Sequence, residues 1–118
     1  MKSSYQSMNI HELYPCWLVA RENHRACHLI DVRSMEEFSS GHVPGAELLP
    51  SSVLMERGSS IPKGEDVYLI CRSGMRSAQA ASFLADRFGY ENLINIEGGT
   101  MAWVKAGYPI EKGEKNEQ

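Results

Sequence analysis

The residues best suited to chemistry form one short stretch, residues 71–77, which reads Cys-Arg-Ser-Gly-Met-Arg-Ser. Before it, residues 66–70 (Asp-Val-Tyr-Leu-Ile) include β-branched and aromatic residues after a Pro/Gly turn signal, a pattern typical of a buried strand. After it, apolar residues at helical spacing predict a helix over residues 77–88, capped by Gly89. The cysteine therefore follows the carboxyl end of a strand, where α/β proteins collect their ligands.

The composition of this loop favours an anionic sulfur. A free thiol has a pKa near 8.5, and a helix N-terminus or nearby guanidinium groups lower that pKa. The glycine permits a positive φ angle, the serines suit a tight turn, and successive N–H groups can curve around an anion. We predict Cys71 as the catalytic nucleophile. The remaining residues are predicted to bind the substrate or the charged sulfur: Arg72, Ser73, Gly74, Met75, Arg76 and Ser77.

The alternative for Cys71 is an inert core residue, since free cysteines are commonly buried as small apolar side chains. Two arginines, a glycine and a helix start around one cysteine argue against that alternative. Met75 could select substrates or simply pack, and we interpret it as packing at the rim of the loop.

The loop resembles the active-site loop of single-domain rhodaneses, small sulfurtransferases that carry sulfur as a cysteine persulfide. Three further segments resemble the same family and occur in the family's order. They are residues 29–33 (Leu-Ile-Asp-Val-Arg) with the pair Glu37 and Phe38, residues 41–46 (Gly-His-Val-Pro-Gly-Ala), and residues 97–103 (Glu-Gly-Gly-Thr-Met-Ala-Trp).

The resemblance implies a thiosulfate sulfurtransferase without a cofactor. Such an enzyme moves sulfane sulfur from thiosulfate or a related small anionic donor to cyanide, a thiol or a protein, through a Cys71 persulfide. It also implies that Asp31 and Arg33 lie near the active site and shape it. An alternative is a rhodanese-like binding or sulfur-relay module that serves a partner protein. A redox sensor is disfavoured because no resolving cysteine is apparent near Cys71.

Loop length argues against a phosphatase. Four residues separate Cys71 from Arg76, whereas tyrosine and dual-specificity phosphatases, and the phosphatases built on the rhodanese fold, have a loop one residue longer. A shorter loop suits one added sulfur atom better than a tetrahedral phosphate.

Two other groups of residues invite a chemical interpretation. His42 could act as a general base, but a thiolate of low pKa needs none, and we favour a hydrogen bond within its own loop. Cys16, His24, Cys27 and His28 could be combined into a zinc site, yet they lack paired Cys-x-x-Cys spacing, and we predict no metal.

The length and composition of the chain limit its domain number and its classes of function. The chain has 118 residues and a net charge of -3, which suits one domain and disfavours general binding of nucleic acid. We expect a single domain over residues 1–110 and a flexible, charged tail over residues 111–118. No signal peptide or membrane span is apparent, and three cysteines do not suggest a disulfide framework. We therefore expect a cytoplasmic protein without membrane association.

The alternation of elements predicts an α/β fold. We expect a three-layer sandwich like that of rhodaneses, with a mainly parallel central sheet and helices on both faces. Helices are predicted from residue 10 to about residue 22, with Asn9 as N-cap and Glu12 as capping glutamate, and over 34–38 with a capping box. Two more are predicted over 51–57 and from residue 100. Strands are predicted over 28–32, 46–49 and 93–96, a surface loop over 58–64, and Trp103 in the core.

Overall fold

The computed structural model describes residues 5–113. Five strands form one sheet in the order β1-β5-β4-β2-β3, and every neighbouring pair is parallel. The strands are β1 (Gln6–Asn9), β2 (Leu29–Asp31), β3 (Glu47–Leu48), β4 (Val67–Ile70) and β5 (Leu93–Glu97). The helices are α1 (Ile10–Glu22), α2 (Met35–Ser40), α3 (Leu54–Arg57), α4 (Met75–Phe88) and α5 (Gly99–Lys105). Short 3-10 turns, η1 (Ser51–Val53) and η2 (Gly58–Ser60), flank α3.

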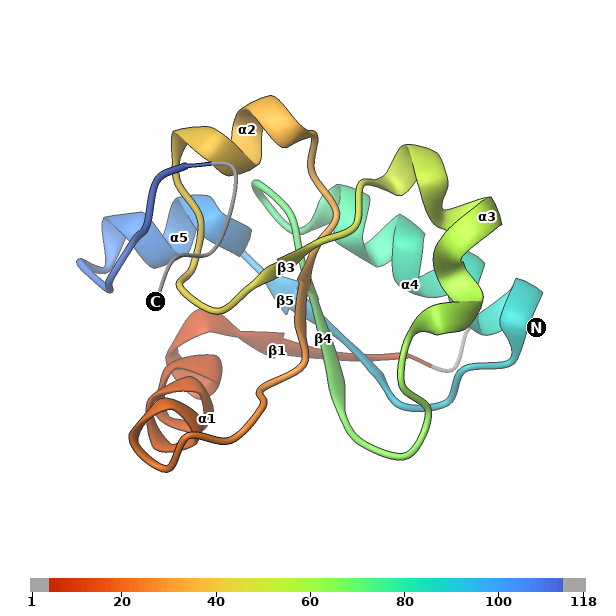
Figure 1. Ribbon diagram of the computed structural model, residues 1–118, viewed down its shortest axis with the longest axis horizontal. Helices are drawn as coiled ribbons and strands as arrows, with labels where there is room; N and C mark the ends of the chain where they lie inside the picture. Colours follow the sequence, from red (N-terminus) through yellow and green to blue (C-terminus); the bar gives the residue numbers. More distant parts are fainter. Residues whose placement is uncertain (1–4, 114–118) are drawn as a thin grey trace.

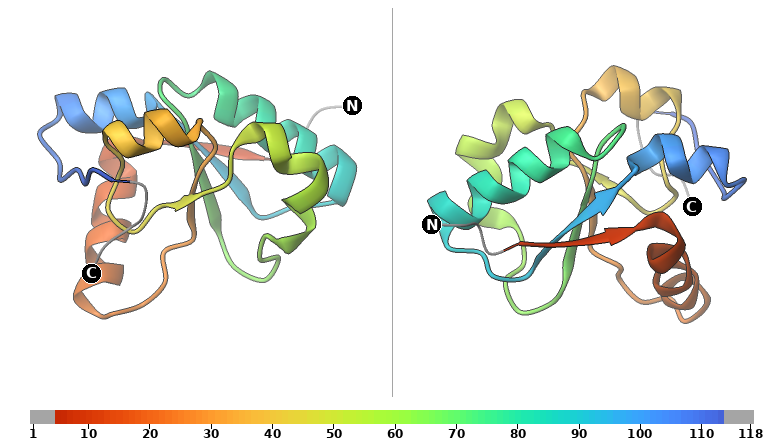
Figure 2. Two further views of the ribbon diagram at one scale, coloured as in Figure 1. Left: turned by 45° about the horizontal axis from the view of Figure 1, so that its top comes forward. Right: turned by 180° about the vertical axis from the view of Figure 1, so that it is seen from behind.

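The helices cover both faces of the sheet. In Figures 1 and 2, α3 and α4 lie together on one side, and α1, α2 and α5 lie on the other. Each side has its own apolar cluster; Leu84 and Tyr90 belong to the first, and Trp17 and Trp103 to the second. The predicted α/β sandwich is therefore confirmed, as is the core position of Trp103.

Alternation along the strands decides which face each side chain reaches. On β4, Leu69 belongs to the cluster beneath α3 and α4, whereas Ile70 belongs to the opposite cluster. Cys71 is two residues after Leu69, so its side chain points to the same face and belongs to the cluster beneath α3 and α4. Asn95 lies on the neighbouring strand β5, in register with Leu69, which is two residues before Cys71 on β4.

Strand β1 was not predicted from the sequence. Its residues are mostly exposed and polar, and they show no apolar alternation. The strand exists because its backbone pairs with β5 in parallel register, from Gln6 with Ile94 to Asn9 with Glu97. It then leads directly into α1, where Asn9 and Glu12 form the predicted capping box.

The other differences from the predicted elements are local. Helix α4 begins at Met75, two residues before the predicted start, because Gly74 takes a left-handed conformation immediately before it. The predicted helix over 51–57 is divided into η1 and α3, and η2 occupies the start of the predicted loop. The capping box of α2, between Ser34 and Glu37, is present as predicted.

Residues placed in the tail are partly paired with the domain. Glu111 exchanges two backbone hydrogen bonds of 2.8 Å with His42, and Gly113 donates one of 2.9 Å to Ser39. The rest of the expected tail, residues 114–118, lies outside the described residues. Within residues 5–113, none of the helices combines the length and apolar character needed to cross a membrane.

Candidate active site

Cys71 lies at the carboxyl end of β4, beneath the loop that leads into α4. Its residue exposure is 1%, and three groups are within hydrogen-bond distance of its sulfur. The backbone N–H groups of Gly74 and Ser77 donate to Sγ at 3.1 and 3.3 Å, and the Ser77 hydroxyl lies at 3.4 Å. The predicted loop therefore encloses the sulfur with donors, an arrangement that stabilises negative charge there.

These contacts shift the ionisation of the thiol. Burial raises the pKa of Cys71, but hydrogen bonds from the Ser77 hydroxyl and from the backbone N–H groups of Ser77, Gly74 and Ser73 outweigh it. The pKa of Cys71 consequently lies below the ordinary value of a thiol. Chemically, such a sulfur is a better nucleophile near neutral pH than an isolated cysteine.

Helix α5 supports the loop from the other side. The N–H of Thr100 donates to the Cys71 carbonyl at 2.8 Å, and that of Met101 donates to the Arg72 carbonyl at 3.0 Å. Gly99 permits this approach: a Cβ there would lie 2.4 Å from the Cys71 carbonyl oxygen, and its φ is +59°. The Glu-Gly-Gly turn thus fits the N-terminus of α5 against the backbone of Cys71.

The two arginines of the loop differ in their surroundings. Both terminal nitrogens of Arg76 donate to the Glu37 carboxylate at 2.8 Å, which ties the start of α4 to α2. Hydrogen bonding to Arg76 is the main cause that lowers the pKa of Glu37 to about 2. The side chain of Arg72 is exposed, and no ion pair involves it within residues 5–113.

Asp31 and Arg33 form a buried ion pair below the site. Their exposures are 0% and 6%. The Arg33 guanidinium donates to the Asp31 carboxylate through Nε at 2.9 Å and through Nη2 at 2.8 Å. Nη2 also donates to the Gly41 carbonyl at 2.8 Å, so the pair braces the segment that follows α2. Neither side chain hydrogen-bonds to Cys71, and the pair supports the backbone beside the site.

His42 is buried and uses its ring locally. Nδ1 is 2.8 Å from the Phe38 carbonyl oxygen, and the ring stacks on that of Phe38 at 3.7 Å between centroids. Nε2 faces Glu111 at 3.5 Å. His42 was expected to bond within its own loop, residues 41–46, but its ring binds the Phe38 carbonyl in α2, the helix that precedes the loop. These local contacts do not point to a general base.

Two residues near the loop were not predicted as parts of the site. Glu37 was noted for its capping box and within a family-like segment, but not as a partner of Arg76, whose guanidinium it binds. Asn95 was assigned only to a strand, yet its amide contacts both Ser77 and Gly74. An asparagine within an otherwise apolar strand run was the signal that could have identified it, because a buried amide needs partners.

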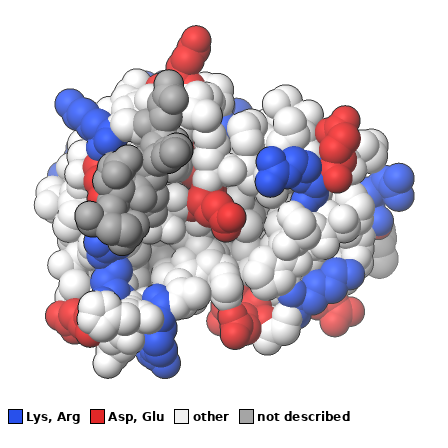
Figure 3. All heavy atoms as spheres, in the orientation of Figure 1, with Lys and Arg blue, Asp and Glu red and all other residues white. Residues whose placement is uncertain are grey.

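A hollow of about 340 Å³ opens beside the Cys71 loop, lined in part by Arg33, Arg72, Thr100 and Met101. Charge on the wider surface is mixed. On the face shown in Figure 3, positive and negative side chains alternate over the coloured area without a broad field of one sign. This face therefore offers no broad positive field to attract an anion.

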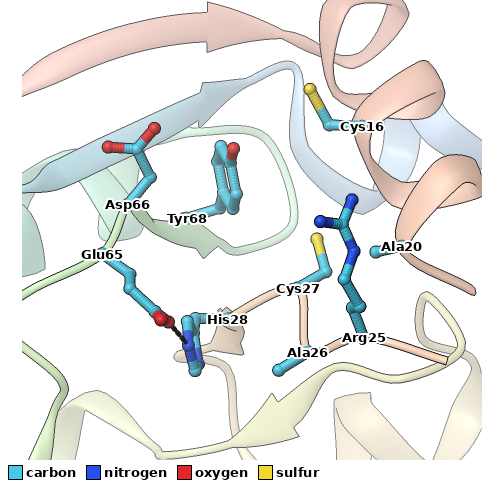
Figure 4. A pocket seen from close by; sticks show the side chains of 9 residues that line it. All are labelled: Cys16, Ala20, Arg25, Ala26, Cys27, His28, Glu65, Asp66 and Tyr68. Atoms are coloured by element: carbon cyan, nitrogen blue, oxygen red, sulfur yellow. Dashed lines mark hydrogen bonds and ion pairs between the residues drawn. The ribbon is translucent and has the colours of Figure 1, made fainter. Parts of the chain in front are cut away.

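A second hollow, of about 510 Å³, lies at the opposite end of the sheet, where strands β2 and β4 begin (Figure 4). Cys16, Cys27 and Tyr68 line it, and a hydrogen bond joins His28 to Glu65 there. Burial, followed by the proximity of Cys16, raises the pKa of Cys27 to about 11, so this thiol stays protonated. No cluster of three or more metal-binding side chains occurs within the part of the chain that the structure describes.

Comparisons with known proteins agree with this geometry. A model of the Rhodanese-like domain family matches residues 15–106. A sulfurtransferase of Allochromatium vinosum is 43% identical over 82 residues, covering 70% of this chain and 76% of that protein. Putative sulfurtransferase YtwF of Bacillus subtilis is 40% identical over 76 residues, covering 64% of this chain and 72% of that protein.

Solved structures give the same answer. The crystal structure of a rhodanese-related protein from Thermoplasma volcanium superposes with a TM-score of 0.75 at 33% identity, covering 91% of this chain and 98% of that one. The chain therefore belongs to the rhodanese-like family of sulfurtransferases.

Proposed function

We propose that this protein carries sulfane sulfur as a persulfide on Cys71, with thiosulfate or a related anionic persulfide as donor. The observation that carries the proposal is the convergence of N–H donors from Gly74 and Ser77 on a buried sulfur whose pKa is lowered. These donors stabilise a thiolate, and they would equally stabilise the negative charge of a persulfide.

The reaction is a double displacement. The Cys71 thiolate attacks the outer sulfur of thiosulfate, a new S–S bond forms, and sulfite leaves with the electron pair of the broken bond. A nucleophilic acceptor then attacks the outer sulfur of the Cys71 persulfide. Cyanide yields thiocyanate, a thiolate yields a new persulfide, and both regenerate the Cys71 thiolate. Covalent catalysis of this kind gives ping-pong kinetics.

The charges near the loop support a small anionic donor. Arg76 is occupied by Glu37, so the exposed Arg72 is the guanidinium best placed to attract an anion to Cys71. The same pairing argues against phosphatase activity, because both terminal nitrogens of the arginine at the end of the loop are already bound to a carboxylate. No cofactor enters this chemistry. A reducing compartment such as the cytoplasm keeps the thiol available, and we place the activity there.

Exposed methionines support a protein as the physiological acceptor. Three exposed methionines lie at the carboxyl ends of the strands, the end of the sheet that holds Cys71. They are in the first turns of α2, α4 and α5: Met35, Met75 and Met101. Met75 has an exposure of 70%. Methionine is soft and adaptable, and it is common on surfaces that bind other proteins. A sulfur relay to a partner protein is accordingly the second candidate function.

Intact mass spectrometry tests the proposal. Incubation of the reduced protein with thiosulfate should add one sulfur atom at Cys71, and cyanide should remove it. Cys71→Ser should take up no sulfur, whereas Cys16→Ser, at the opposite edge of the sheet, should load normally. Loading of Cys71→Ser would refute the mechanism. Loading by persulfide donors but not by thiosulfate, with faster delivery to a protein thiol than to a small thiol, would favour the relay.

A further inference from the structure

Asn95 is a buried polar residue directly behind the Cys71 loop. It lies on β5 opposite Leu69 of β4, and its exposure is 4%. Leu93, two residues before it, packs in the cluster beneath α3 and α4, so the side chain of Asn95 points to the same side as Cys71. A buried amide is costly unless its donors and acceptor are satisfied.

Both ends of the Asn95 amide bind residues that also bind the sulfur. Nδ2 donates to the Gly74 carbonyl at 3.3 Å, and Oδ1 is 2.5 Å from the Ser77 hydroxyl. The Gly74 carbonyl can only accept, which fixes Nδ2 toward it and Oδ1 toward Ser77. Because Oδ1 can also only accept, the Ser77 hydroxyl must donate its single hydrogen to Asn95 in this arrangement.

The sulfur and the amide therefore share one proton donor. The Ser77 oxygen is 2.5 Å from Asn95 Oδ1 and 3.4 Å from Cys71 Sγ, and its hydrogen can serve one of them at a time. While Cys71 is a neutral thiol, the hydroxyl can donate to Asn95 and accept from the S–H group. When the sulfur is an anion, a charge-assisted hydrogen bond draws the hydroxyl toward it, and Asn95 loses its donor.

We propose that Asn95 is a positioning residue that holds Gly74 and Ser77 against the sulfur and competes with Cys71 for the Ser77 hydroxyl proton. The inference rests on the proposed persulfide chemistry for its biological meaning, but its test does not. Asn95 limits how readily the sulfur becomes an anion, while its bond to Gly74 keeps the loop N–H groups in place.

Two substitutions of similar size should have opposite effects. In Asn95→Leu, the Ser77 hydroxyl has only the sulfur as partner, so the thiolate fraction of Cys71 below its midpoint should rise about tenfold, one pKa unit. The Gly74 carbonyl loses one long bond, but the bonds of α5 to the loop remain. In Asn95→Asp, a carboxylate retains the hydroxyl and cannot donate to Gly74, so the thiolate fraction should fall about tenfold.

The measurement is the pH dependence of alkylation of Cys71 by iodoacetamide, with the modified cysteine identified by mass spectrometry. It needs no sulfur donor, so it can succeed even where sulfur loading fails. Asn92→Leu is the matched control: its amide donates to the carbonyls of Pro62 and Glu65, away from the loop, and the Cys71 midpoint should not move.

Coupling to Ser77 completes the test. In a Ser77→Ala background, Asn95→Leu should change the thiolate fraction of Cys71 less than twofold, because the shared proton is gone. Shifts of the same sign in Asn95→Leu and Asn95→Asp would overturn the proposal. An undiminished effect of Asn95→Leu in the Ser77→Ala background would also overturn it. If Asn95→Leu does not fold, Asn95→Asp alone must give the lower thiolate fraction, or the inference is wrong.

Discussion

Gly99→Ala should damage both the stability and the chemistry of this protein. The added Cβ would lie 2.4 Å from the Cys71 carbonyl oxygen and 2.5 Å from that of Arg72, about 1 Å inside ordinary contact at 3.4 Å. These two oxygens accept the hydrogen bonds from Thr100 and Met101 that hold α5 to the loop. To relieve the overlap, either the N-terminus of α5 or the loop must move.

The size of the effect follows from these contacts. An alanine at a φ of +59° costs about 1 kcal/mol in backbone conformation. Two displaced hydrogen bonds cost about 1 kcal/mol each, so the free energy of unfolding should fall by about 3 kcal/mol. A shift of about 1 Å in the backbone of the nucleophile should slow sulfur loading at least about tenfold.

Gly89→Ala is the matched control. Gly89 has a φ of +78°, and a Cβ there would meet nothing within 4 Å. This variant should lose only the conformational contribution of about 1 kcal/mol and should load sulfur at a rate within about twofold of the original. Urea titrations give the free energies, and the time course of persulfide formation by mass spectrometry gives the rates. Equal stabilities and equal rates for the two variants would refute the tight fit of α5 against the loop.

Two further predictions concern the ion pairs around the loop. Glu37 has a pKa of about 2 in the folded protein against an ordinary 4.5, so its carboxylate stabilises the fold above pH 4.5, and this stabilisation is lost as the pH falls through about 2. Because Glu37 is a third exposed, Glu37→Gln should lower the free energy of unfolding by about 1 kcal/mol or less at pH 7. In urea titrations, the difference in stability between the variant and the original protein should narrow below pH 4.5. A difference that widens at low pH would contradict the pairing. Asp31→Leu leaves the buried Arg33 unpaired and should cost about 3 to 5 kcal/mol by the same assay, whereas the double variant Asp31→Leu/Arg33→Met should recover most of that loss. If the double variant were no more stable than the single one, the buried charge would not be the cause.

Local features of the sequence were enough to predict most of the elements and the nucleophile. Apolar runs marked β4 and β5, helical spacing marked α4, and side-chain caps marked the starts of α1 and α2. Cys71 was recognisable because a thiol, a glycine and a helix start within a few residues already form one end of a strand–loop–helix unit. These properties depend on backbone conformation and hydrogen bonds between near neighbours, which the order of residues largely determines.

The partners of the loop were decided only by the tertiary structure. Arg76 is 39 residues from Glu37, and Ser77 is 18 residues from Asn95, so no local pattern shows that these pairs meet. Strand β1 has no apolar periodicity and forms because β5 offers its backbone an open edge. The sequence alone thus singled out Cys71 as the proposed nucleophile and placed it at the end of a strand. Which residues hold the loop around its sulfur depended on strand register and on the packing of α2 and α5, because groups distant in sequence meet only when the sheet is assembled.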